Sequence, residues 1–169
     1  DGGGFLGIAL LIGVGVGFAA AGMVFLIEVF ERGSGLLGDQ VGSVIAPLIT
    51  VPLGIFGAWW LALRFAPEVA GDGVPEVSAA LAVRGGYLST RSIPLKIIAT
   101  ALTLGGGGSA GREGPIVQVG GAIGSSIARH SGMAEDKVKS LLAAGAAAGI
   151  GASFDAPIAG MLFALEVIL

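Results

Sequence analysis

The two stretches that decide the fold of this 169-residue chain are GDGVPE, residues 71–76, and GREGP, residues 111–115. In both, glycines allow the backbone to turn sharply, and a proline follows where a new helix begins, because a proline in the first helical turn gives up no hydrogen bond. The first N–H groups of a helix have no partner within it and carry a partial positive charge. Two such helix starts aimed at one point in a membrane form a binding site for an anion. We therefore expect broken helices that enclose an anion pathway.

The composition places the chain in a lipid bilayer. Hydrophobic residues make up 54% of it and charged residues 12%, and the mean hydropathy is +0.91, too apolar for a soluble domain of this length. Residues 2–27 and 41–63 contain no ionisable side chain. Each stretch exceeds the roughly 20 residues that a helix needs to cross about 30 Å of hydrocarbon. The 32 glycines indicate closely packed helices, because small residues let helix backbones approach one another within lipid.

The same composition excludes several classes of function. The chain has no cysteine and a single histidine, His130, so we expect no disulfide, no metal site and no cofactor. A net charge of −3 lacks the basic footprint of a nucleic-acid-binding protein. The first apolar stretch has no basic start and is too long for a signal peptide, so we expect no cleaved segment. The chain begins with Asp1 and ends on apolar residues, which indicates a piece of a longer protein.

Apolar runs, interrupted by glycine, proline and polar clusters, predict the order of the helices. We expect them over residues 5–31, 44–65, 74–83, 93–104, 115–128, 135–151 and from 157 to the end, with a Gly/Ser-rich turn over residues 32–43 and a polar loop from residue 129 into the next helix. Asp155 is expected to cap the last helix, because aspartate is a preferred N-cap residue. The cluster of Arg84, Arg91 and Lys96 favours a cytoplasmic position for the connection that they surround.

Residues 111–121, GREGPIVQVGG, closely resemble the signature of the CLC family of chloride channels and chloride/proton antiporters. Residues 71–76 stand where that family has its Gly-Ser-Gly-Ile-Pro-Glu motif, and residues 145–149 and 154–160 resemble its next two helices. The resemblance implies an all-α integral membrane protein, a bundle of spanning and broken, re-entrant helices built from two inverted repeats. Residues 1–169 resemble the first repeat, the N-terminal half of the transmembrane domain, and the second repeat is absent.

The resemblance also implies the partners of the protein. They are chloride or other small anions, the lipid bilayer, a second copy in a homodimer whose subunits each have an anion pathway, and the missing second repeat, with no nucleic acid. We expect the protein in the plasma (inner) membrane of a prokaryote.

Glu113 is the strongest candidate for a functional residue. A charged side chain within a membrane costs about 2.5–3.5 kcal/mol on insertion scales, so it rarely lies there without a role. The N–H groups that bind chloride also bind a carboxylate, so the two compete, and the resemblance implies that Glu113 is a gating glutamate released by protonation. The alternative is that Glu113 only caps its helix.

The resemblance places an anion site at both helix starts, with Asp72, Gly73, Val74, Gly111, Arg112 and Gly114 as candidates. Arg112 either raises the local positive potential or pairs with a nearby acid. Asp72 departs from the serine that is common in the family, and a carboxylate in the site would repel chloride. We expect Asp72 to cap its own helix, the alternatives being that it is protonated or that it faces the cytoplasmic water.

A second departure concerns protons. In the antiporters, the position matching Glu166 is followed by a glutamate that relays protons, and here Val167 stands in its place. Valine cannot titrate, so the sequence favours passive chloride conduction, with exchange of chloride or another halide for protons as the alternative. Glu113 and Glu166 are the candidates for a proton pathway, and Glu166 is expected to be buried with a polar partner.

A different class of function is an intramembrane serine protease, because Ser109 lies in a glycine loop and His130 is available as a base. The sequence disfavours this hypothesis, since His130 falls in a distant polar segment with no evident group to orient it. We therefore expect a protein that is not an enzyme.

Overall fold

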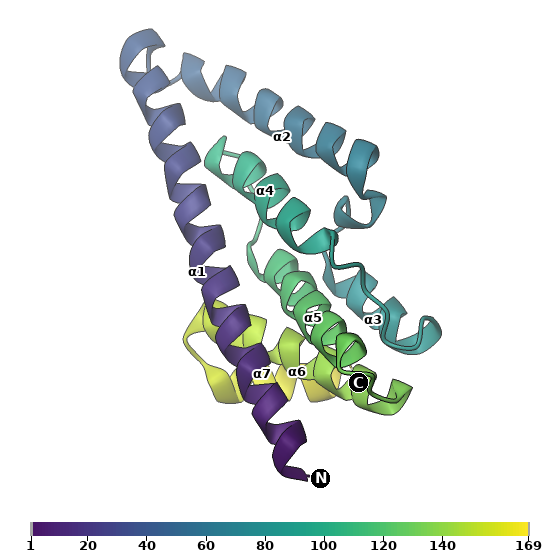
Figure 1. Ribbon diagram of the computed structural model, residues 1–169. Coiled ribbons are helices and arrows are strands. Elements are labelled where there is room, and N and C mark those ends of the chain that lie inside the picture. Colours follow the sequence, from purple (N-terminus) through teal and green to yellow (C-terminus); the bar gives the residue numbers. More distant parts are fainter. Residues whose placement is uncertain (1, 169) are drawn as a thin grey trace.

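A computed structural model describes residues 2–168, and the elements within that range are helices. The first two, α1 (Gly2–Val41) and α2 (Ile45–Phe65), form a long hairpin that is joined at the top of Figure 1. With 40 residues, α1 is about 60 Å long at 1.5 Å per residue. Apolar side chains of both helices point outward: Leu10 and Phe18 of α1 are 72% and 76% exposed, and Leu48 of α2 is 71% exposed. Both helices are long and apolar enough to cross a membrane.

The sequence predicted a turn over residues 32–43, and this prediction is wrong for most of these residues, because α1 continues to Val41. Ser34 holds this part of the helix, since its hydroxyl donates to the carbonyl oxygens of Glu31 and Gly105 at 2.9 and 3.0 Å. The chain turns only at Gly42, whose φ of +97° is a conformation that favours glycine. A contact with a distant helix therefore overrides the weak helix propensity of this glycine-rich stretch.

The middle of the chain is made of short elements. A single turn, η1 (Pro67–Val69), precedes α3 (Val74–Val83) and α4 (Ser92–Gly105). The ten residues of α3 extend only about 15 Å, which confirms that this helix is too short to span. Helix α4 lies between α1 and α2 in Figure 1. Its Gly105 passes so close to α1 that an added Cβ would lie 2.9 Å from the carbonyl oxygen of Ile27.

The centre of the molecule is the pair α5 (Glu113–His130) and α6 (Glu135–Phe154). The backbones touch at Gly120 and Gly145, where a Cβ on either residue would overlap the carbonyl oxygen of the other. Such close approach confirms the packing expected from the glycine content. Both helices run two or three residues further than expected, so Arg129 and His130 belong to α5 rather than to a loop. Around α5 and α6 lie buried apolar side chains that include Val77, Leu88, Val117, Leu142 and Ile150.

The last segment consists of α7 (Pro157–Phe163) and a π-helical turn, η2 (Ala164–Ile168). Asp155 does not cap α7, contrary to the sequence prediction. It ends α6 in the left-handed conformation, with a φ of +52°, and Ala156 is the residue that precedes α7 without a side-chain cap. Aspartate tolerates this conformation better than most residues, and the chain needs it here to reverse direction between two packed helices.

Candidate functional site

The starts of α3 and α5 converge, and glycine makes this possible. Gly73, immediately before α3, has a φ of +120°, and a Cβ on it would overlap the carbonyl oxygen of Gly114. Pro75 lies in the first turn of α3, and Pro115 is the third residue of α5. The sequence therefore predicted correctly that two broken helices begin at these motifs. Their first turns meet, so the partial positive charges of both helix starts act on one region.

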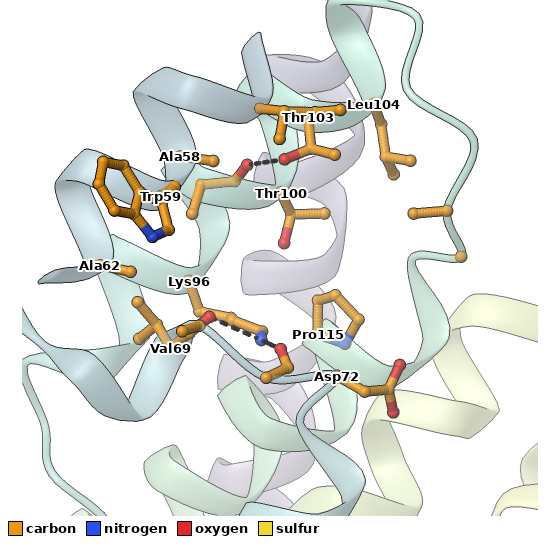
Figure 2. A pocket seen from close by; sticks show the side chains of 16 residues that line it. Ala58, Trp59, Ala62, Val69, Asp72, Lys96, Thr100, Thr103, Leu104 and Pro115 are labelled. Carbon is orange, nitrogen blue, oxygen red and sulfur yellow. Dashed lines mark hydrogen bonds between the residues drawn. The ribbon is translucent and has the colours of Figure 1, made fainter. Parts of the chain in front are cut away.

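The backbone before α3 is held by two buried polar side chains. Lys96, which is 3% exposed, donates from Nζ to the carbonyl oxygen of Val69 at 3.1 Å and to that of Gly71 (Figure 2). From α5, the Nε2 of Gln118 donates to the carbonyl oxygen of Glu68 at 2.8 Å. These bonds fix the path of the chain into α3.

Of the three cations around the connection between α3 and α4, Lys96 is buried and Arg84 and Arg91 are exposed, and the cytoplasmic position of the connection stays a prediction. The ammonium lies inside the protein because carbonyl oxygens from the loop before α3 replace its water. Sequence reasoning missed both Lys96 and Gln118 as residues of the site. The sequence does offer one indication for Lys96, because it is the single ionisable residue of the otherwise uncharged helix α4.

Asp72 does not cap α3, so the preferred prediction for this residue is wrong. The N-cap of α3 is Gly73, no side chain caps that end, and the N–H of Gly73 instead donates to Oε2 of Glu76 at 3.1 Å. The carboxylate of Asp72 lies against Gly114, where an added Cβ would be 2.5 Å from Oδ1. Figure 2 shows it pointing away from the Lys96 ammonium, on the side of Pro115. It is exposed and lines a cavity beside the start of α5.

Glu113 begins α5, and its half-buried side chain folds back over the preceding loop. Its Cδ lies 3.4 Å from the point where a Cβ on Gly111 would be, and Oε2 lies closer still. Arg112 donates to the carbonyl oxygen of Ser153 at 3.3 Å, at the end of α6. Its guanidinium forms no salt bridge within residues 2–168. This favours the first of the two alternatives for Arg112, a cation that raises the local potential.

Two cavities meet at the loop before α5. One has a volume of about 410 Å³ and is lined by Asp72, Lys96, Thr100, Thr103 and Pro115 among others. The second, of about 460 Å³, is lined by Glu28, Glu31, Arg112 and Glu113 among others. Leu104, Ala110 and Gly111 contribute to the walls of both. The start of α5 therefore separates a cavity that contains Asp72 from a cavity that contains Glu113.

Glu166 and Val167 lie apart from both cavities, on η2. Glu166 is exposed, and in the part of the chain that the structure describes its carboxylate has no hydrogen-bond partner, so the expectation of a buried, paired Glu166 is wrong. Val167 beside it is 51% exposed. Neighbouring apolar side chains on α7 and η2, such as Ile158 and Leu165, are also exposed. Glu166 is therefore on a surface of this chain, away from the convergent helix starts.

Ser109 and His130 cannot act together as a protease pair. Ser109 lies in the loop before α5 and His130 ends that helix, so the 18 residues of α5 separate them by about 27 Å. The Nδ1 of His130 lies 2.8 Å from the carbonyl oxygen of Ser126. The histidine contacts its own helix and not the serine.

Comparisons with known proteins agree with this geometry. The sequence model of a family described as voltage gated chloride channel matches residues 53–169. The chain is 37% identical, over 166 residues, to the H(+)/Cl(-) exchange transporter ClcA of Vibrio parahaemolyticus, and the match covers 94% of this chain and 35% of that protein. Among solved structures, it is similar to a slow cyanobacterial Cl−/H+ antiporter, with a TM-score of 0.80 and 31% identity over 94% of this chain and 39% of the other. The chain thus spans little more than a third of the length of these relatives.

Proposed function

The chain belongs to the CLC family of voltage-gated chloride channels and their antiporter relatives, and we propose that it forms the first half of a pathway that carries chloride or another small anion across a membrane. One observation carries this proposal. The residue before α3, Gly73, touches the first turn of α5 at Gly114, so both helix starts act on the same region. An anion there is stabilised by partial charges instead of by a full cation, which favours binding that is still weak enough for release.

In this proposal Glu113 is the gate. Its carboxylate folds back over Gly111 at the same helix start that would hold the anion. An anion and a carboxylate compete for the same N–H groups, because both are negatively charged acceptors. Protonation removes the charge of Glu113 and its advantage at the helix start, which opens the pathway.

Exchange of the anion for protons is the form of transport that we favour. The names of both relatives describe chloride/proton exchange, and this outweighs the argument for passive conduction that Val167 provides. Passive conduction is kept as the second candidate, because Val167 has no titratable group at a position where a proton-carrying glutamate would serve exchange.

The remaining parts of the proposal concern the whole protein. Residues 1–169 are the first of two inverted repeats, and the second repeat completes the anion site. Two complete copies form a homodimer with one pathway in each. The exposed apolar side chains of α7 and η2 are available to such neighbours. The exchanger from Vibrio makes the plasma membrane of a prokaryote the favoured location.

The experiment uses the complete protein reconstituted in liposomes with a chloride gradient. Chloride efflux is followed with an electrode, and the external pH with a sensitive meter. Exchange predicts that the chloride gradient drives protons against their own gradient. Passive conduction predicts chloride flux with no proton movement and a reversal potential that follows chloride alone. The absence of any anion flux would contradict both.

A further inference from the structure

Two carboxylates flank the first turn of α5, one in each of the two cavities that meet there. Asp72 lies against Gly114 on one side, and Glu113 folds over Gly111 on the other. The cavity of Asp72 and the cavity of Glu113 share the wall formed by Leu104, Ala110 and Gly111. Leu104 lies near the end of α4, and Ala110 and Gly111 belong to the loop before α5, so the two acidic groups line neighbouring cavities at the start of this helix.

The charged groups around the two carboxylates differ. Asp72 shares its cavity with Lys96 of α4, but its carboxylate points away from the Lys96 ammonium, which is bound to the carbonyl oxygens of Val69 and Gly71 (Figure 2). Glu113 faces Glu28 and Glu31 from α1 and its neighbour Arg112.

We propose that Asp72 is a second proton-carrying side chain of the pathway and exchanges protons with Glu113. The inference rests on the proposed exchange function. In one transfer, a proton leaves a carboxyl oxygen of Asp72 and binds a carboxylate oxygen of Glu113, directly or through water in the cavities. Asp72 becomes a carboxylate and Glu113 becomes neutral, so the pair keeps one negative charge. Asp72 is then protonated again by a hydronium ion from the water that reaches its cavity.

The alternatives within the chain serve this role poorly. Val167 cannot hold a proton. Glu166 lies on the exposed face of η2 and lines neither cavity. Lys96 has its ammonium engaged by the carbonyl oxygens of Val69 and Gly71. Asp72 is the group that combines a titratable side chain, access to a cavity and a place at the start of α5.

The test compares variants of the complete protein in liposomes, with chloride and proton fluxes measured together. Asp72→Asn and Asp72→Ser should lower the ratio of proton to chloride flux by roughly a hundredfold, because a positioned proton-carrying group is lost. Their chloride flux should rise, since a negative charge leaves the pathway. Asp72→Glu, which keeps a carboxyl group, should restore most of the ratio. The matched control is Asp136→Asn, an exposed aspartate in the first turn of α6 and outside both cavities, which should leave the ratio within about twofold of the wild type.

An Asp72→Asn protein with the wild-type ratio overturns the inference. So does a variant that loses chloride and proton flux in equal proportion, because Asp72 then acts on the structure or on the anion. Failure of the exchange function itself is recognised earlier, in the wild-type protein, as chloride flux without proton movement.

Discussion

The start of α3 and the start of α5 have similar sequences but different environments. Before α3, the buried Lys96 and Gln118 hold the backbone of residues 68–71, and Glu76 accepts a hydrogen bond from the N–H of Gly73. Before α5, Gly111 and Arg112 are exposed, and Glu113 lies over the loop with a cavity beside it. Three side chains hold the start of α3 in place. At the start of α5, the side chain of Glu113 lies beside a cavity into which it can move.

In the proposed anion pathway, the groups that bind the anion and the group that gates the pathway have different requirements. Donors that bind a permeating anion are most effective when they are held in position in advance, because no reorganisation is then needed when the anion arrives. A gate has the opposite requirement, since it must leave the site. In the proposed pathway, the start of α3 therefore holds the anion, and Glu113 is the group that moves. The following predictions test this contrast, beginning with the largest expected effect.

Glu113→Gln in the complete protein should remove the pH dependence of chloride flux. Glutamine keeps the size of the side chain but has no charge with which to compete for the N–H groups, so the pathway should be open at neutral as well as at acid pH. Flux from liposomes at the two pH values measures this. If the variant and the wild type keep the same steep pH dependence, Glu113 is not the gate.

Lys96→Met should destabilise the protein by about 3 kcal/mol. The carbonyl oxygens of Val69 and Gly71 lose charge-assisted hydrogen bonds, each of which is worth about 1.5–3 kcal/mol, and the removal of a buried charge offsets part of the loss. The midpoint of thermal unfolding in detergent gives the effect. Lys137→Met, at an exposed lysine of α6, is the control and should stay within about 0.5 kcal/mol. Equal midpoints for the two variants would show that the start of α3 is not held by Lys96.

Gly114→Ala should push the two helix starts apart. The new Cβ would lie 2.5 Å from Oδ1 and 2.6 Å from the backbone oxygen of Asp72, an overlap that costs about 1–3 kcal/mol. We expect chloride affinity, measured by calorimetry, to fall about tenfold, which corresponds to about 1.4 kcal/mol. Gly33→Ala is the control, because no atom lies within 4 Å of its added Cβ and a helical alanine is favoured over glycine. Unchanged affinity in Gly114→Ala would mean that contact between the helix starts does not shape the anion site.

Glu76→Gln should have the smallest effect. The amide oxygen of glutamine can still accept the hydrogen bond from the N–H of Gly73, and only the favourable charge near the helix start is lost, at a cost of about 0.5 kcal/mol. Glu76→Ala removes the hydrogen bond as well and should cost about 1 kcal/mol. Thermal unfolding of both variants measures the difference. A glutamine variant as unstable as the alanine variant would show that charge alone, and not the hydrogen bond, stabilises this start.

Much of the fold followed from local patterns in the sequence. The glycine and proline residues of both motifs predicted where α3 and α5 begin, because turn geometry and the missing proline N–H are properties of a few adjacent residues. The start and end of α3 at Val74 and Val83 were predicted for the same reason. The continuation of α1 beyond Glu31 was not predicted, since it depends on the contact between Ser34 and Gly105, 71 positions away.

The sequence by itself determined the membrane-spanning helices, the two helix starts and the acidic residue at the second start. Hydrophobicity and backbone preference act over a few residues and are visible in the order of the chain. Only the tertiary structure decided that Lys96 is buried and bonded to the backbone before α3, that Asp72 turns toward Gly114 and that Glu166 lies on a surface. The position of each of these side chains depends on contacts with residues that are distant in the sequence. Glu68 and Gln118, for example, are joined by a hydrogen bond although they are 50 positions apart.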